Sequence, residues 1–173
     1  MRSCSNLARG AALVVAALLA TEAQAQVPSA APGELAIASL HAEGVQIYQC
    51  KPDSGKPSPA GQGLTWQFIE PVAGLFVAGK HTGLHYAGPN WDHIDGSGVK
   101  GKVIASAPGA TAMDIPWLKL DVTDHRGKGM LSDATAVLRV NTKGGLAQGP
   151  CERAGEYLSV SYAADYIFLY KGE

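Results

Sequence analysis

The side chains best suited to chemistry gather in one short segment, residues 81–97. It holds three of the five histidines, His81, His85 and His93, together with two carboxylates, a tyrosine and a tryptophan. Glycine and proline recur through the same stretch, which predicts a looped backbone rather than one continuous strand. We therefore expect any functional site to be built around this segment.

One chemistry that this segment could support is metal binding. Imidazole combined with carboxylate suits zinc, copper or manganese, so His81, His85 and His93 are candidate ligands for a divalent metal cofactor. The spacing alone does not define such a site, because on a strand residues 81 and 85 share a face but lie about 13 Å apart. The three rings would converge only if the chain folds back on itself.

A second chemistry is the binding of a small molecule or a carbohydrate. Aromatic rings can cover a flat apolar face while a few polar groups fix the orientation of the ligand. The candidate ligand-binding residues are His85, Tyr86, Asn90, Trp91, Asp92, Asp95 and Trp117. We favour this binding role over the others.

Acid/base hydrolysis is an alternative at the same segment, with Asp92 or Asp95 acting beside His85 or His93. The sequence lacks the Gly-x-Ser-x-Gly elbow that would identify a serine nucleophile, so no catalytic residue is assigned. A structural role in the cell envelope is a further alternative. Asp95 followed by glycine is typical of a hairpin turn, and Trp91 would fit a hydrophobic core.

The elements that must position these residues are short strands separated by turns. Two runs alternate with a period of two, over residues 118–123 and 158–170, and the aromatic face of the second predicts a core face. Arg139 and Asp165 fall on different expected strands, where they could pair. With 21 glycines and 10 prolines, the chain is predicted to be all-β, a single-domain β-sandwich or small β-barrel. The expected strands are 45–50, 64–69, 83–86, 99–106, 117–123, 134–141 and 157–170.

The N-terminal residues predict export to the periplasm or beyond. Residues 1–25 combine two arginines, an apolar run over 11–20 and an Ala-x-Ala cleavage pattern, as a signal peptide does. Residues 26–43 are expected to form a flexible leader with a short helix over 33–42, and residues 44–173 a single domain. After cleavage we expect no membrane anchor. The net charge of −1 gives no basic surface for nucleic acid, and the oligomeric state is left open.

Cleavage of the signal peptide would also remove Cys4 and leave two cysteines, Cys50 and Cys151. In an oxidising compartment an isolated pair of this kind most often forms a disulfide. The alternative is two separate buried thiols. A bridge would close a loop of about 100 residues and stabilise the fold by about 4–5 kcal/mol.

Several short motifs, taken together, resemble a known family. They are Gly44–Cys50, His85–Asp92, Asp95–Ser97, Ile115–Leu118, Arg139–Gly145, Cys151 and Tyr162–Tyr166. This combination resembles a family of secreted bacterial and fungal proteins designated domain of unknown function 3455. The resemblance implies export, one domain and a pair of cysteines, and it implies no activity that could be assigned to residues.

Overall fold

The computed structural model describes residues 27–53 and 63–172; the signal peptide expected over residues 1–25 lies outside them. Within the described part every regular element is a strand, and no helix is long and apolar enough to cross a membrane. The strands are β1 (Glu34–Pro52), β2 (Leu64–Val77), β3 (Lys80–Tyr86), β4 (Asn90–His93), β5 (Gly98–Ala107), β6 (Trp117–Arg126), β7 (Ala136–Gly144) and β8 (Tyr157–Lys171).

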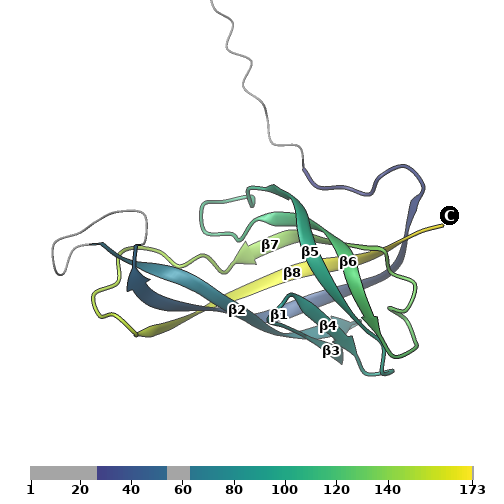
Figure 1. Cartoon of the computed structure of the whole chain (residues 1–173), viewed down its shortest axis with the longest axis horizontal. Helices are drawn as coiled ribbons and strands as arrows, with labels where there is room; N and C mark the ends of the chain where they lie inside the picture. Colours follow the sequence, from purple (N-terminus) through teal and green to yellow (C-terminus); the bar gives the residue numbers. More distant parts are fainter. Residues whose placement is uncertain (1–26, 54–62, 173) are drawn as a thin grey trace, which may run out of the picture.

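The eight strands form one antiparallel sheet that closes into a barrel (Figure 1). Each strand pairs with the next along the chain, and β8 returns to pair with β1. This confirms the all-β prediction and selects the barrel from the two architectures expected. The β1–β8 ladder joins Glu34–Gln49 to Tyr157–Lys171 and is the longest among the described strands. This pairing leaves neither β1 nor β8 as an open edge of the sheet.

The start of β1 corrects one expectation from the sequence. Residues 33–42 form neither a flexible leader nor a short helix, because β1 begins at Glu34 and pairs with β8 from there onward. Leu40 and Ala42 point into the barrel while His41 and Glu43 lie on its outer face. The alanines of this stretch are too small to give a clear alternation of hydropathy, and the long-range partner strand decides its structure.

The aromatic face of β8 is a core face, as its alternation predicts. Tyr162, Ala164, Tyr166 and Phe168 are buried inside the barrel. Trp91 of β4 packs edge-on against Phe168, with ring centroids 6.0 Å apart. The residues between the inward-facing ones point outward, so the sheet has an apolar inner face and a more polar outer one.

The strands differ greatly in length, and one side of the wall is therefore incomplete. β3 and β4 contain only 7 and 4 residues, whereas β1 contains 19. Residues 64–72 of β2 pair with β1 alone, and residues 102–107 of β5 pair with β6 alone among the described strands. The short β3–β4 hairpin fills the wall at one end of the barrel only, and beside it β2 and β5 separate (Figure 1).

The two cysteines are joined, which confirms the predicted disulfide. Cys50 near the end of β1 bridges to Cys151, which precedes β8, with the two Cα atoms 5.8 Å apart. Backbone bonds from Cys50 to Glu156 and from Gly155 to Cys50 hold the same junction. A disulfide is compatible with an extracellular location.

We predict that the double variant Cys50→Ser/Cys151→Ser folds to the same barrel but loses about 4–5 kcal/mol of unfolding free energy, because the unfolded chain regains the entropy of the open loop. Urea denaturation followed by tryptophan fluorescence measures this loss. The unsubstituted protein in reductant should move to the same denaturation midpoint. A loss below about 1 kcal/mol in both experiments would contradict the stabilising role given to the bridge.

Candidate functional site

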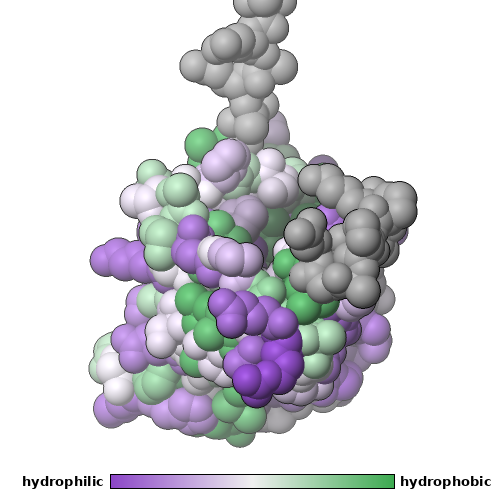
Figure 2. Space-filling model, turned by 90° about the vertical axis from the view of Figure 1, so that its left-hand side faces the viewer, coloured by the Kyte–Doolittle hydropathy of each residue, from purple (hydrophilic) through white to green (hydrophobic). Residues whose placement is uncertain are grey.

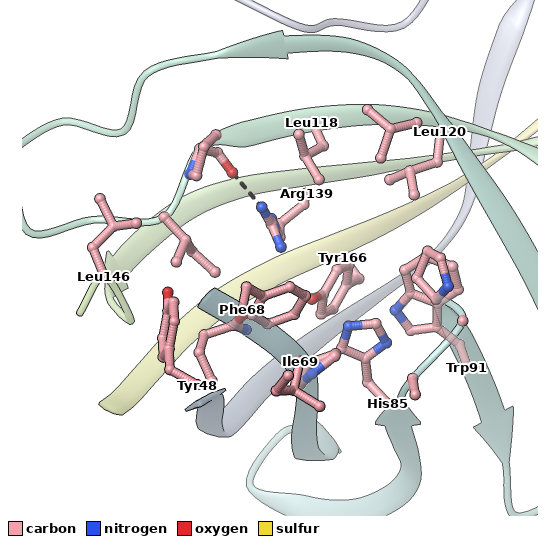
Figure 3. Close-up of a pocket in the computed structure, with 18 of the residues that line it drawn as sticks. Tyr48, Phe68, Ile69, His85, Trp91, Leu118, Leu120, Arg139, Leu146 and Tyr166 are labelled. Carbon is pink, nitrogen blue, oxygen red and sulfur yellow. Dashed lines mark hydrogen bonds between the residues drawn. The ribbon is translucent and has the colours of Figure 1, made fainter. Parts of the chain in front are cut away.

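A cavity of about 440 Å³ lies inside the barrel, at the place where the wall is incomplete (Figure 3). Its walls come from β1, β2, the β3–β4 hairpin, β5, β6, β7 and β8, so no short stretch of sequence contains it. The described residues that line it include no aspartate or glutamate. Apolar and aromatic side chains predominate: Tyr48, Trp66, Phe68, Ile69, Pro71, Ala87, Pro89, Trp91, Val103, Ile115, Pro116, Leu118, Leu120, Leu146 and Tyr166.

The mouth of the cavity is formed by side chains that are both exposed and apolar. Phe68 and Ile69 of β2 and Val103 of β5 line the cavity with exposed fractions of 51%, 39% and 46%. A β-bulge in β2 places Ile69 opposite no residue of β1, so two successive side chains reach the cavity. Figure 2 views the molecule from the left-hand side of Figure 1, where apolar residues are exposed among polar ones.

His85 and Trp91 form the inner wall, and both were singled out from the sequence. Their rings stack with centroids 4.8 Å apart and an interplanar angle of 15°, and Tyr166 lies equally close to His85. His85 Nδ1 donates to the carbonyl of Asn90 at 2.8 Å, because a carbonyl can only accept. The remaining ring nitrogen, Nε2, is therefore a hydrogen-bond acceptor in the neutral imidazole. Burial lowers the pKa of His85 to about 4.

Two donors at the cavity lack a hydrogen-bond partner, and a third group, the Arg139 guanidinium, lacks a partner of opposite charge among the described residues. Gln46 is 2% exposed, and its Nε2 has no hydrogen-bond partner among the described residues; the same holds for Trp91 Nε1. Arg139 is partly buried, and its Nε donates to the carbonyl of Pro116 at 3.0 Å (Figure 3). No carboxylate in the described part of the chain forms an ion pair with Arg139.

The positive charge of Arg139 acts on the tyrosines that surround it. Burial raises the pKa of Tyr166, and the neighbouring Arg139 opposes this rise. The same is true of Tyr48, whose hydroxyl donates to the carbonyl of Gly145 at 2.7 Å. Both tyrosines therefore stay neutral, and among the described residues that line the cavity Arg139 carries the single formal charge.

Other residues expected at the site lie outside the cavity, in a polar network. Tyr86 donates to Asp92 at 2.7 Å, and Arg126 forms an ion pair with Asp92 at 2.6 Å. This hydrogen bond to Asp92 raises the pKa of Tyr86. Asn90 is turned toward the carbonyl of Ala87. These contacts fix the β3–β4 hairpin, and none of the three expected residues lines the cavity.

Asp95 organises a turn on the outside of the barrel. Its carboxylate accepts hydrogen bonds from the backbone of Met130 at 2.7 Å and from the backbone and hydroxyl of Ser97. These bonds lower the pKa of Asp95. His93 lies 3.0 Å from the same carboxylate. Of the expected acid/base pairs the structure brings together Asp95 and His93, on the outside of the barrel, whereas neither Asp92 nor Asp95 lines the cavity beside His85.

The three histidines proposed as metal ligands do not converge. His81 is exposed and packs edge-on against Phe76, whereas His85 is buried in the inner wall and His93 contacts Asp95. Over residues 27–53 and 63–172 no three His, Cys, Asp or Glu side chains are grouped so that they could hold a metal ion. The register of the β2–β3 pairing shifts between Gly83 and His81, so His81 does not share the inward face of His85, and His93 lies on β4 opposite Gly83.

Trp117 lies at a second hollow, on the outer face of the barrel. It packs against Ala136, Leu138, Val140 and Leu169 rather than inside the lumen. Trp117 Nε1 has no hydrogen-bond partner among the described residues, whereas two carboxylates of this outer groove, Asp114 and Asp165, are hydrogen-bonded to neighbouring groups. Asp165 accepts from His41 and from Asn141, each at 2.8 Å, and Asp114 accepts from Gly144 and Thr111.

The sequence did not identify Gln46 and Arg139 as site residues, although with His85 they are the main polar side chains of the lumen. The expected pairing of Arg139 with Asp165 is wrong, because β7 aligns Arg139 with Tyr166 and places Asp165 on the opposite face. Arg139 could have been placed in the lumen from the alternation of β8 together with the register of the β7–β8 pairing. Register depends on partners distant in the sequence, so the signal could not be used before the fold was known.

We predict that His85 makes the protein less stable as the pH falls from about 6.5 to about 4. The unfolded chain binds a proton on this imidazole in that range while the folded chain does not, so up to about 3 kcal/mol of unfolding free energy is lost. The variant His85→Asn keeps a donor for the Asn90 carbonyl and should show a shallower slope of stability against pH. Urea denaturation at several pH values measures it.

The matched control is His81→Gln, since His81 is exposed on the same strand. This variant should keep the slope of the unsubstituted protein. An NMR titration midpoint near 6.5 for His85, or equal slopes for His85→Asn and the unsubstituted protein, would contradict the buried neutral state.

Comparison with known proteins gives a family and no described activity. No curated protein and no solved structure matches this chain at a significant level. A family model, described as a protein of unknown function (DUF3455), matches residues 30–170, which spans nearly all of the barrel. The chain therefore belongs to the DUF3455 family.

Proposed function

We propose that this protein binds one small, mainly apolar molecule in the lumen of its barrel. The observation that carries the proposal is the cavity itself, about 440 Å³ in volume and lined by aromatic and aliphatic side chains with a few converging polar groups. Cavities of about 300–1,000 Å³ with this composition are typical of small-molecule sites. An eight-stranded barrel is also just wide enough to hold one small ligand.

The incomplete wall supplies a route for entry. Side chains of β2 and β5 at the mouth are apolar and exposed, and contact of apolar area with water costs free energy. A bound molecule in contact with Phe68, Ile69 and Val103 would remove part of this area from water. The apolar mouth therefore favours binding of an apolar ligand from solution.

An apolar ligand fits the cavity better than a carbohydrate. A sugar presents many hydroxyl groups, and each buried one needs a hydrogen-bond partner. The lumen offers few such partners, chiefly Gln46, His85 and Arg139, against a much larger apolar wall. The carboxylates Asp92 and Asp95, which would suit sugar hydroxyls, are held outside the cavity.

We infer that this binding takes place outside the cytoplasm. The signal-like residues 1–25 predict export, and the Cys50–Cys151 disulfide is compatible with an oxidising compartment. A periplasmic or secreted binding protein would meet apolar molecules from the cell envelope or from the surroundings.

We predict that a neutral hydrophobic dye, N-phenyl-1-naphthylamine, binds the protein saturably at one site with increased fluorescence. The variant Val103→Trp should weaken this binding by about tenfold or more, because the larger side chain fills the mouth. The matched control is Ile104→Trp. Ile104 neighbours Val103 and is 51% exposed, but does not line the cavity, so its variant should bind the dye as the unsubstituted protein does.

Two results would overturn this proposal. The first is that the dye does not bind saturably to the folded protein. The second is that both tryptophan variants weaken binding equally, which would place the dye on the outer surface of β5 rather than in the lumen.

A further inference from the structure

We propose that the natural ligand is an amphipathic monocarboxylate whose carboxylate is bound by Arg139 inside the barrel. This inference rests on the proposed function and names the class of ligand. Three observations lead to it: a guanidinium without a carboxylate partner, a buried amide whose donor is unsatisfied, and a cavity wall without acidic side chains among the described residues.

The first observation is the state of Arg139. A charge removed from water is costly unless an opposite charge or several hydrogen bonds compensate it. Its Nε donates to the Pro116 carbonyl and its guanidinium also interacts with the Tyr166 hydroxyl, but no carboxylate in the described part of the chain forms an ion pair with it. Arg139 points into the cavity from β7, with Phe68 and Tyr166 across from it (Figure 3). Its terminal nitrogens can therefore meet a ligand.

The second observation is independent of Arg139 and concerns Gln46. This side chain is almost fully buried at the cavity; it lies near the Tyr162 hydroxyl, but no hydrogen bond of normal geometry satisfies its Nε2 donor among the described residues. An orphaned donor of this kind is uncommon in folded proteins and points to a missing acceptor. A carboxylate oxygen accepts hydrogen bonds only, so it would suit both Gln46 and Arg139.

The third observation is the positive charge of the lumen. Arg139 is the only charged side chain lining the cavity in the described part of the chain, and His85 is neutral at physiological pH. A cationic ligand would meet this charge without a neutralising partner, and an uncharged ligand would leave it uncompensated. One planar guanidinium matches one planar carboxylate in charge and in bidentate geometry.

The rest of the cavity determines the remainder of the ligand. Apolar and aromatic walls extend from Arg139 to the open mouth at Phe68 and Val103. They suit an aliphatic or aromatic body attached to the carboxylate, as in a fatty acid or an aromatic acid. A ligand carrying a doubly charged phosphate would bring more negative charge than one guanidinium can balance.

The test compares dodecanoate with 1-dodecanol, at pH 7.5 and below the critical micelle concentration of dodecanoate, as competitors of N-phenyl-1-naphthylamine. The two probes share a chain length and differ in the charged head. We expect dodecanoate to displace the dye from the unsubstituted protein at a concentration about 10- to 100-fold lower than that of 1-dodecanol. This arm needs no variant, so it stands whether or not a substitution at Arg139 folds.

The second arm uses Arg139→Gln with Arg153→Gln as its control, since Arg153 is exposed and does not line the cavity. The first variant should abolish the preference for dodecanoate while 1-dodecanol still binds. The second should keep the preference. Arg139→Lys should retain part of it, because the charge remains but the bidentate geometry is lost.

The outcomes separate this inference from the function on which it rests. If the dye does not bind in the lumen, the proposed function fails. If the dye binds and the acid and the alcohol displace it equally, or if Arg139→Gln weakens both alike, the lumen is a binding site but the carboxylate assignment is wrong.

Discussion

Pairing of β1 with β8 closes the sheet into a barrel. The rest of the structure depends on the different lengths of the strands that form its wall. β1 and β8 are long, with 19 and 15 residues, while β3 and β4 on the opposite part of the wall are short. A barrel with strands of such unequal length cannot be sealed everywhere. The side opening between β2 and β5, the cavity behind it and the exposed apolar mouth all follow from this one mismatch.

The lumen combines a large apolar surface with one charge and very few dipoles. In such surroundings electrostatic interactions are strong, and each unpaired polar group is costly. Among the described residues Gln46 Nε2 has no hydrogen-bond partner and Arg139 has no carboxylate partner, whereas the hydroxyl of Tyr48 and Nδ1 of His85 donate to backbone carbonyls. Tyr48 and His85 therefore shape the cavity, whereas Gln46 and Arg139 are free to bind a ligand. Because Arg139 is positively charged, the proposed ligand is an anion.

Much of the fold was predictable from the sequence, but the site was predictable only in part. The alternation of residues 162–168 identified the core face of β8, and the pairing expected of Cys50 and Cys151 identified the disulfide. The segment 81–97 did contribute His85 and Trp91 to the cavity. Its other polar residues, among them Asp95, fix turns, since glycine-rich loops need the same carboxylates and amides that binding sites use. Gln46 and Arg139 lie about ninety residues apart, and only barrel closure brings their strands to one lumen.

The central claim is that an amphipathic acid enters the lumen rather than covering the outer face of the barrel. An ¹⁵N-HSQC titration of the uniformly labelled protein with dodecanoate tests it most directly. The account predicts saturable shift changes that are largest for the amides of Gln46, Trp91 and Arg139, and unchanged signals for Thr111 and Asn141 in the outer groove. Changes confined to the outer groove, or changes that do not saturate, would contradict it.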